Sequence, residues 1–131
     1  MSARLAADAV TLVHFAFVLF AVFGGLLALR HWRYALLHLP AAAWGSYAVI
    51  TGTLCPLTPL ENALRRRAGE AGYEGGFIEH YLMPVLYPDG LTTASQQWLG
   101  IGCIAINVAV YVWVLARARR RHALSMPRES A

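Results

Sequence analysis

Residues 9–29 read AVTLVHFAFVLFAVFGGLLAL and contain no Asp, Glu, Lys or Arg. Two further stretches share this property: residues 34–55, YALLHLPAAAWGSYAVITGTLC, and residues 98–116, WLGIGCIAINVAVYVWVLA. Each stretch has close to the roughly 20 apolar residues that a helix needs to cross a hydrocarbon core of about 30 Å. The sequence therefore predicts an all-α membrane protein with about three transmembrane helices.

The composition of the chain agrees with this prediction. Hydrophobic residues make up 58% of the 131 residues and charged residues only 14%, whereas a typical soluble domain is about 25% charged. We expect residues 1–131 to form a single membrane domain, because the chain is too short for separate soluble and membrane modules. The first stretch exceeds the roughly 7–15 residues of a secretory signal and lacks a small-x-small cleavage site, so we expect it to be retained.

Arginines predict the orientation of the helices. Arg30 and Arg33 lie between the first two apolar stretches, and four further arginines lie within residues 117–121. Three crossings place both clusters on one side, which the positive-inside rule identifies as the cytoplasm. We therefore expect the N-terminus and residues 56–97 outside, and the basic tail, residues 117–131, inside. These arginines lie next to the membrane without base-stacking aromatic residues, so we expect no nucleic-acid binding.

The outer segment, the 42 residues 56–97, is expected to begin with a short helix. The sequence Thr58-Pro59-Leu60-Glu61 is typical of a capping box, in which Thr58 is the N-cap and Glu61 reaches back to its amide. This helix is expected to run to about Ala68 and to stop at Gly69.

A second short helix is expected from Phe77 to about Tyr87, where apolar residues recur with helical period. It is too short to span, and Pro84 limits it further. Whether residues 77–97 are interfacial or re-entrant stays open.

Small residues predict the faces through which the helices touch, because close packing stabilises helix pairs in lipid. One such stripe contains Ala41, Gly45, Ala48 and Gly52. The polar residues His14, His38 and Asn107 fall on faces of this kind. Since a polar group facing lipid would lack a hydrogen-bond partner, His38 and Asn107 are the second set of intramembrane polar positions, expected to hydrogen-bond between helices.

Residues that carry chemistry are expected to gather at the outer level of the membrane. The candidate polar or metal site contains His14, Cys55, Glu61, Glu79 and His80. Imidazole, thiolate and carboxylate groups bind transition metals and transfer protons. The alternative is that these residues hold no ligand: Glu61 only caps a helix, and Glu79 and His80 form the solvent-exposed face of an interfacial helix.

Two histidines on one haem iron are not expected. By helical rise His14 and His38 should differ by roughly 15 Å in height within the membrane. No ligand-spacing motif indicates a metal or a haem, and the cofactor and the catalytic residues stay unknown.

Four segments carry a resemblance to a known family: HFAFVLF at 14–20, HLPAAAWG at 38–45, CPLTPLEN at 55–62 and GGFIEHYL at 75–82. Together they resemble a family of small bacterial membrane proteins designated domain of unknown function 2784. The resemblance covers Ala6 to about Leu115. It implies a bacterial inner-membrane protein of one domain, and it implies no activity and no catalytic residue.

Two classes of function remain. The sequence contains no complete catalytic set, so we favour a non-enzymatic bundle that binds lipid, a membrane-protein partner or a second copy of itself. The alternative is a membrane protein that holds a metal, a haem or a quinone-type molecule near the outer face, at His14, Cys55, Glu79 and His80.

Overall fold

The computed structural model describes residues 2–86, 88 and 92–126, and this part of the chain is all-helical, as predicted. Its elements are α1 (Ala3–Phe23), the 3-10 helix η1 (Gly24–Leu29), α2 (Arg33–Thr51), α3 (Leu57–Arg67), the π-helical turn η2 (Ile78–Leu82), α4 (Met83–Leu86) and α5 (Thr93–Ser125).

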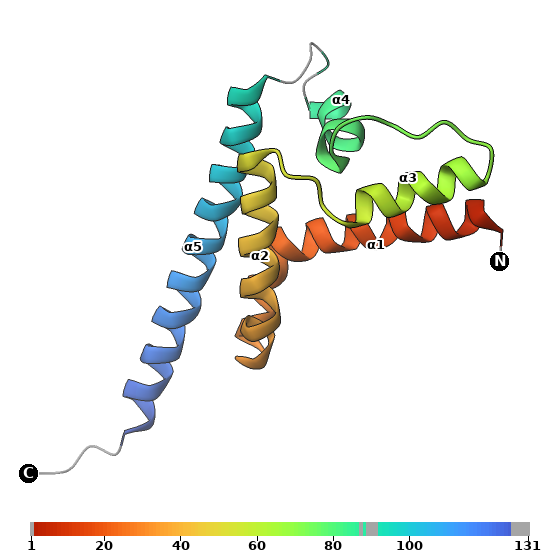
Figure 1. Ribbon diagram of the computed structural model, residues 1–131. Coiled ribbons are helices and arrows are strands. Elements are labelled where there is room, and N and C mark those ends of the chain that lie inside the picture. Colours follow the sequence, from red (N-terminus) through yellow and green to blue (C-terminus); the bar gives the residue numbers. More distant parts are fainter. Residues whose placement is uncertain (1, 87, 89–91, 127–131) are drawn as a thin grey trace, which may run out of the picture.

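The three long helices do not run alongside one another over their whole length. Helices α2 and α5 lie side by side, whereas α1 approaches α2 from the side and α3 packs along α1 (Figure 1). Helix α4 lies between α3 and the start of α5 in this view. The first residues of α2 and the last residues of α5 point to the same end of the molecule, and α4 lies towards the opposite end (Figure 1).

Two helical segments within the described residues are long and apolar enough to cross a membrane: Ala3–Leu29, with 27 residues, and Thr93–Ser125, with 33 residues. The expected count of three is not supported, because α2, with 19 residues, is long enough but not apolar enough to meet this standard. Gly52 adopts a left-handed conformation with φ of 69° and ends α2 at Thr51. The second apolar stretch therefore loses its last four residues, which were expected to continue the helix to Cys55.

The carbonyl of Ala21, near the change from α1 to η1, accepts hydrogen bonds from side chains of two other helices. The amide of Gly24 makes a helical hydrogen bond to the carbonyl of Phe20. The next carbonyl, that of Ala21, accepts hydrogen bonds from Nε2 of His38 at 3.2 Å and from Nδ2 of Asn107 at 3.0 Å. Side chains from α2 and α5 thus both bind the end of α1.

The same contact fixes the tautomer of His38, which is fully buried. A carbonyl oxygen can only accept, so Nε2 of His38 must carry the proton. Its Nδ1 lies 2.7 Å from the hydroxyl of Tyr111, at hydrogen-bond distance. His38 therefore links α1, α2 and α5.

The first outer helix has the expected end but not the expected cap. Gly69, with φ of 78°, follows α3, and the amide of Glu70 bonds to the carbonyl of Arg65. The capping box is wrong: the N-cap is Pro56, and it makes no side-chain cap bond. The amide of Thr58 already bonds to the carbonyl of Cys55 at 2.9 Å, so the helix begins earlier and both Thr58 and Glu61 face inwards.

The second outer helix is irregular because of its proline. Pro84 has no amide hydrogen and cannot continue the regular α-helical pattern. The amide of Met83 bonds to the carbonyl of Ile78, five residues earlier, which is the spacing of a π-helical turn. The expected end near Tyr87 lies outside the described residues.

Helix α5 begins at Thr93 with a capping box between Thr92 and Ser95, so the end of the outer segment is helical.

Gly100 tests the packing of α2 against α5. A Cβ atom at Gly100 would collide with Cγ1 of Ile50, whereas a Cβ at Gly102 would meet nothing within 4 Å. We expect Gly100→Ala to lower the free energy of unfolding by about 1–3 kcal/mol, as other overpacked sites do. Gly102→Ala should be neutral or stabilising, because alanine favours helix by up to about 1 kcal/mol.

Thermal unfolding of both variants in mild detergent measures the difference. Equal melting temperatures for Gly100→Ala and Gly102→Ala would mean that α2 and α5 do not touch at this level.

Candidate functional site

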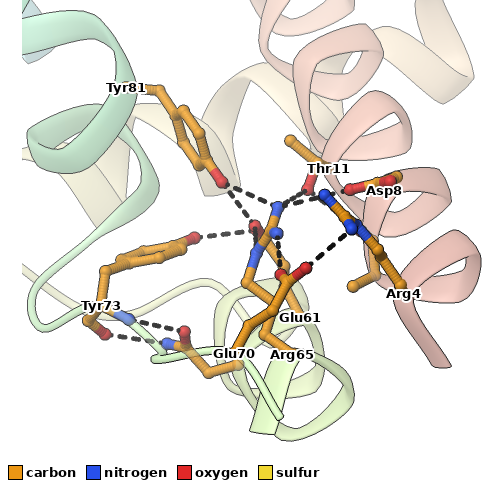
Figure 2. A network of polar contacts seen from close by, with 10 residues as sticks. Arg4, Asp8, Thr11, Glu61, Arg65, Glu70, Tyr73 and Tyr81 are labelled. Atoms are coloured by element: carbon orange, nitrogen blue, oxygen red, sulfur yellow. Dashed lines mark hydrogen bonds and ion pairs between the residues drawn. The ribbon is translucent and has the colours of Figure 1, made fainter. Parts of the chain in front are cut away.

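A buried carboxylate lies at the centre of the outer segment. The side chain of Glu61, on α3, is fully buried and accepts three hydrogen bonds (Figure 2). Oε1 accepts from Nε of Arg65 at 2.9 Å and from the hydroxyl of Tyr81 at 2.7 Å, and Oε2 accepts from the hydroxyl of Tyr73 at 2.9 Å. We refer to Glu61, Arg65, Tyr73 and Tyr81 as the Glu61 network.

Arg65 extends the Glu61 network to helix α1. Its Nη1 donates to Glu70 at 3.0 Å, and its Nη2 donates to the hydroxyl of Thr11 on α1 at 3.1 Å. Arg4, also on α1, forms an ion pair with Glu70 at 3.0 Å (Figure 2). Helix α3 is therefore tied to the N-terminal half of α1 by charge as well as by packing.

The protonation states of the network follow from its hydrogen bonds. Burial by itself would raise the pKa of Glu61, but the hydrogen bonds from Tyr81, Tyr73 and Arg65 outweigh it, so the pKa of Glu61 lies below its usual value. Burial and the hydrogen bond to Glu61 raise the pKa of both tyrosines. Glu61 is thus ionised and the tyrosines are protonated near neutral pH.

Arg65 keeps its charge in this setting. Burial alone would lower its pKa, but the bonds to Glu61 and Glu70 raise it. Every member of the network is therefore held away from titration at neutral pH, whereas a general acid or base works best with a pKa near the operating pH. The hydrogen bonds and ion pairs of the network hold the segments that carry it together.

The second feature is a partly open cavity of about 220 Å³, which we refer to as the central cavity. Its walls come from α1, α2 and α5, and η2 and α4 cover it. Most of its lining is apolar, including Phe17, Val18 and Leu99. Cavities for small molecules are usually about 300–1,000 Å³, so the central cavity has room for part of a larger ligand.

The small-residue stripe of α2 faces this cavity. Gly45, Ala48 and Gly52 line it, whereas the buried residues of α2 are His38, Ala42 and Ser46. The stripe was expected to pack against another helix, and at Gly45 it does, since a Cβ there would lie 3.4 Å from Cβ of Ala21 on α1. Ala48 and Gly52 also border the cavity.

The structure divides the five predicted site residues between these two features. His14, Cys55 and Glu79 line the central cavity, as does Cys103. Glu61 belongs to the network, and the ring of His80 stacks on Tyr73 with 4.0 Å between the ring centroids. Among the described residues no three His, Cys, Asp or Glu side chains are placed to hold a metal ion.

His14 is the most unusual residue of the cavity lining. It is 3% exposed, and its ring stacks on Phe77 with a centroid separation of 3.9 Å. Its Nδ1 is buried and has no hydrogen-bond partner in the protein. A buried polar atom without a partner costs about 1–3 kcal/mol.

Sequence reasoning missed Arg65, Tyr73 and Tyr81 as partners of Glu61. The spacing of Glu61 and Arg65, four residues apart on one helix, is a readable signal for an ion pair. The tyrosines come from the following segments, and nothing in the local sequence places their hydroxyls on Glu61.

These features define a small helical protein with two apolar helices long enough to cross a membrane, a segment at residues 56–97 that is anchored to α1, and an apolar cavity. The chain belongs to the family described as Protein of Unknown function (DUF2784), whose model matches residues 4–112. No curated protein and no solved structure matches the chain.

Removing the cation of the network tests its role as an anchor. Arg65→Met leaves the buried Glu61 carboxylate without its cation, and breaking a buried pair in this way costs about 3–5 kcal/mol. Arg67→Met is the matched control, because Arg67 lies on the same helix and is exposed. Chemical denaturation in detergent should show a large loss for Arg65→Met only. Similar losses in both variants would argue against the anchor.

The lowered pKa of Glu61 makes stability depend on pH in a defined direction. The stability that the ionised carboxylate provides is complete above its unfolded-state pKa of about 4.3, and it is lost as the pH falls through the lower folded-state pKa. Glu61→Gln cannot lose this contribution. The melting temperature of the wild type should therefore fall towards that of Glu61→Gln between about pH 5 and about pH 3. Parallel curves would show that Glu61 is not ionised in the folded protein.

Proposed function

We propose that this protein is a non-enzymatic, multi-pass protein of the bacterial cytoplasmic membrane that binds a lipid-class molecule in the central cavity. The observation that carries the proposal is the cavity itself, which is lined mainly by apolar side chains from four parts of the chain. An apolar cavity with a few polar groups is the usual form of a site for a small apolar molecule.

The distribution of polar and apolar residues supports a membrane environment. The buried hydrophobic side chains of the described residues are few and mostly small: Ala7, Ala21, Ala28, Ala42, Phe77 and Met83. The buried polar ones are at least as numerous and include His14, His38, Glu61 and Asn107. Only 11% of the most apolar part of α5 is buried in the protein. Apolar side chains facing outwards and polar ones facing inwards suit a protein surrounded by lipid.

Three crossings are part of this proposal. The membrane would be crossed by Ala3–Leu29, by α2 and by α5. The first of these segments would cross as a tilted and bent helix. Its 27 residues correspond to about 40 Å, which allows a tilted path through a core of about 30 Å. The 19 residues of α2 correspond to about 28 Å, which is just enough for a crossing.

The proposed orientation is N-terminus outside and C-terminus inside. The pair Arg4–Glu70 ties the start of α1 to the outer segment. Arg30 and Arg33 lie near the first residues of α2, at the end of the molecule to which the arginine-rich end of α5 also points (Figure 1). Arginine clusters of this kind favour the cytoplasmic side.

Photolabelling with a long-chain alkane that carries a diazirine tests the cavity directly. In nanodiscs we expect the label, mapped by mass spectrometry, to concentrate on cavity segments 44–55 and 96–103. Gly45→Leu should lower this labelling about fivefold or more, because its side chain would occupy the space beside Ala21 and Phe17.

Gly102→Leu is the control, since Gly102 has open space around it and does not line the cavity. It should leave the labelling unchanged. Labelling spread evenly over the outward faces of α1 and α5, with no effect of Gly45→Leu, would contradict the proposal.

A further inference from the structure

We infer that the end of the molecule formed by the start of α2 and the end of α5 binds the head groups of anionic phospholipids. Six arginines lie there, which we refer to as the arginine cluster: Arg30, Arg33, Arg117, Arg119, Arg120 and Arg121. None of them lines the central cavity. The inference rests on the membrane crossing in the proposed function and concerns a different surface.

The fold brings together arginines that are far apart in the sequence. A Cβ atom at Gly100 would collide with Cγ1 of Ile50, so these two residues lie at one level of the antiparallel helices α2 and α5. Arg33 precedes Ile50 by 17 residues. Arg117 follows Gly100 by the same 17 residues. At 1.5 Å per residue both arginines are about 25 Å from that level, towards the same end of the molecule (Figure 1).

The arginine cluster has little negative charge beside it. All six side chains are exposed, and none of the ion pairs among the described residues involves them. Residues 9–60 contain no acidic residue, and residues 117–131 contain five arginines and one acidic residue, Glu129. This end of the molecule therefore has a positive field that attracts anions.

Exposed aromatic residues next to the arginines indicate the level of the lipid head groups. Trp32, Tyr34 and Trp113 are exposed, and Trp and Tyr concentrate where a membrane meets water. The guanidinium of Arg117 lies over the ring of Trp113, 5.8 Å from its centroid, in a cation–π contact. The 19 apolar residues 98–116 cover about 28 Å of a core of about 30 Å, so Arg117 follows where the hydrocarbon ends.

One face of α5 offers contacts for both parts of a phospholipid. Arg117 and Arg120 share this face with Trp113, because the three residues are spaced by three and four positions. Ile106, seven residues before Trp113, continues the face and is exposed. Acyl chains can lie against the apolar residues while the guanidinium groups bind the phosphate, for which their forked geometry is suited. A soluble phosphate would have only the second contact, so the occupant that fits is a lipid.

Native mass spectrometry in mild detergent tests this binding with phosphatidylglycerol. Phosphatidylcholine with the same acyl chains is the zwitterionic reference. We expect the wild type to bind phosphatidylglycerol at roughly tenfold lower concentration than phosphatidylcholine. Combining Arg33→Gln with Arg117→Gln should weaken phosphatidylglycerol binding about tenfold or more, because each arginine near an anionic lipid contributes a factor of about five. Phosphatidylcholine binding should not change.

The matched control combines Arg66→Gln with Arg67→Gln. It removes the same charge from two exposed arginines of α3, outside the arginine cluster, and it should leave the binding of both lipids unchanged. Unfolding curves check that both double variants fold, and the comparison of the two lipids in the wild type does not depend on any variant.

Several outcomes would overturn the inference. One is equal binding of the two lipids by the wild type, and another is an equal loss of phosphatidylglycerol binding in both double variants. Glycerol 3-phosphate that competes as well as the intact lipid would identify the partner as a soluble phosphate. A single-stranded RNA that displaces the lipid at lower concentration than phosphatidylglycerol itself binds would identify it as a nucleic acid.

Failure of the inference and failure of the proposed function give different results. If Gly45→Leu loses phosphatidylglycerol while the Arg33 and Arg117 double variant keeps it, the lipid enters the central cavity, which overturns the inference and supports the proposed function. Release of the chain from membranes by alkaline carbonate would refute the membrane crossing on which both depend.

Discussion

The carbonyl of Ala21 is the contact on which the arrangement of the long helices depends. It lies where α1 gives way to η1, and it accepts hydrogen bonds from His38 of α2 and Asn107 of α5. In a weakly polar environment an unpaired carbonyl is costly, so these bonds favour the position in which α1 meets α2 and α5. Gly24 permits this approach, because a Cβ there would lie 2.6 Å from Cδ2 of His38. The central cavity lies beside this junction and includes Ala21 in its lining.

The structure contains two groups of buried polar side chains with different roles. The Glu61 network has charged groups and hydroxyls that satisfy one another, and it fastens the outer segment to α1. His14 also lies on α1 and belongs to the cavity lining, and its Nδ1 is buried without a partner. Phe77 and Tyr81 connect the two, since Phe77 stacks on His14 and Tyr81 bonds to Glu61. The network therefore holds in place the segment from which Phe77 reaches the cavity.

The sequence predicted the helical class, the end of α3 at Gly69 and the buried positions of His38 and Asn107, because each follows from composition or from local backbone preferences. It did not predict the end of α2 at Thr51, since a glycine in an apolar run gives no local sign of a left-handed conformation. The capping-box interpretation of Glu61 failed for a related reason: the helix began at Leu57, which turned the carboxylate towards Tyr73 and Tyr81 from segments far along the chain. The cavity could not be predicted either, because small residues indicate packing and a cavity equally well.

Native mass spectrometry of the protein released from membranes tests the central claim most directly. The account predicts one bound lipid-class molecule per chain in the central cavity. It predicts that this adduct is absent from Gly45→Leu, in which the cavity is filled. A chain that carries no adduct, or whose adducts are the same in the wild type and in Gly45→Leu, would contradict the account.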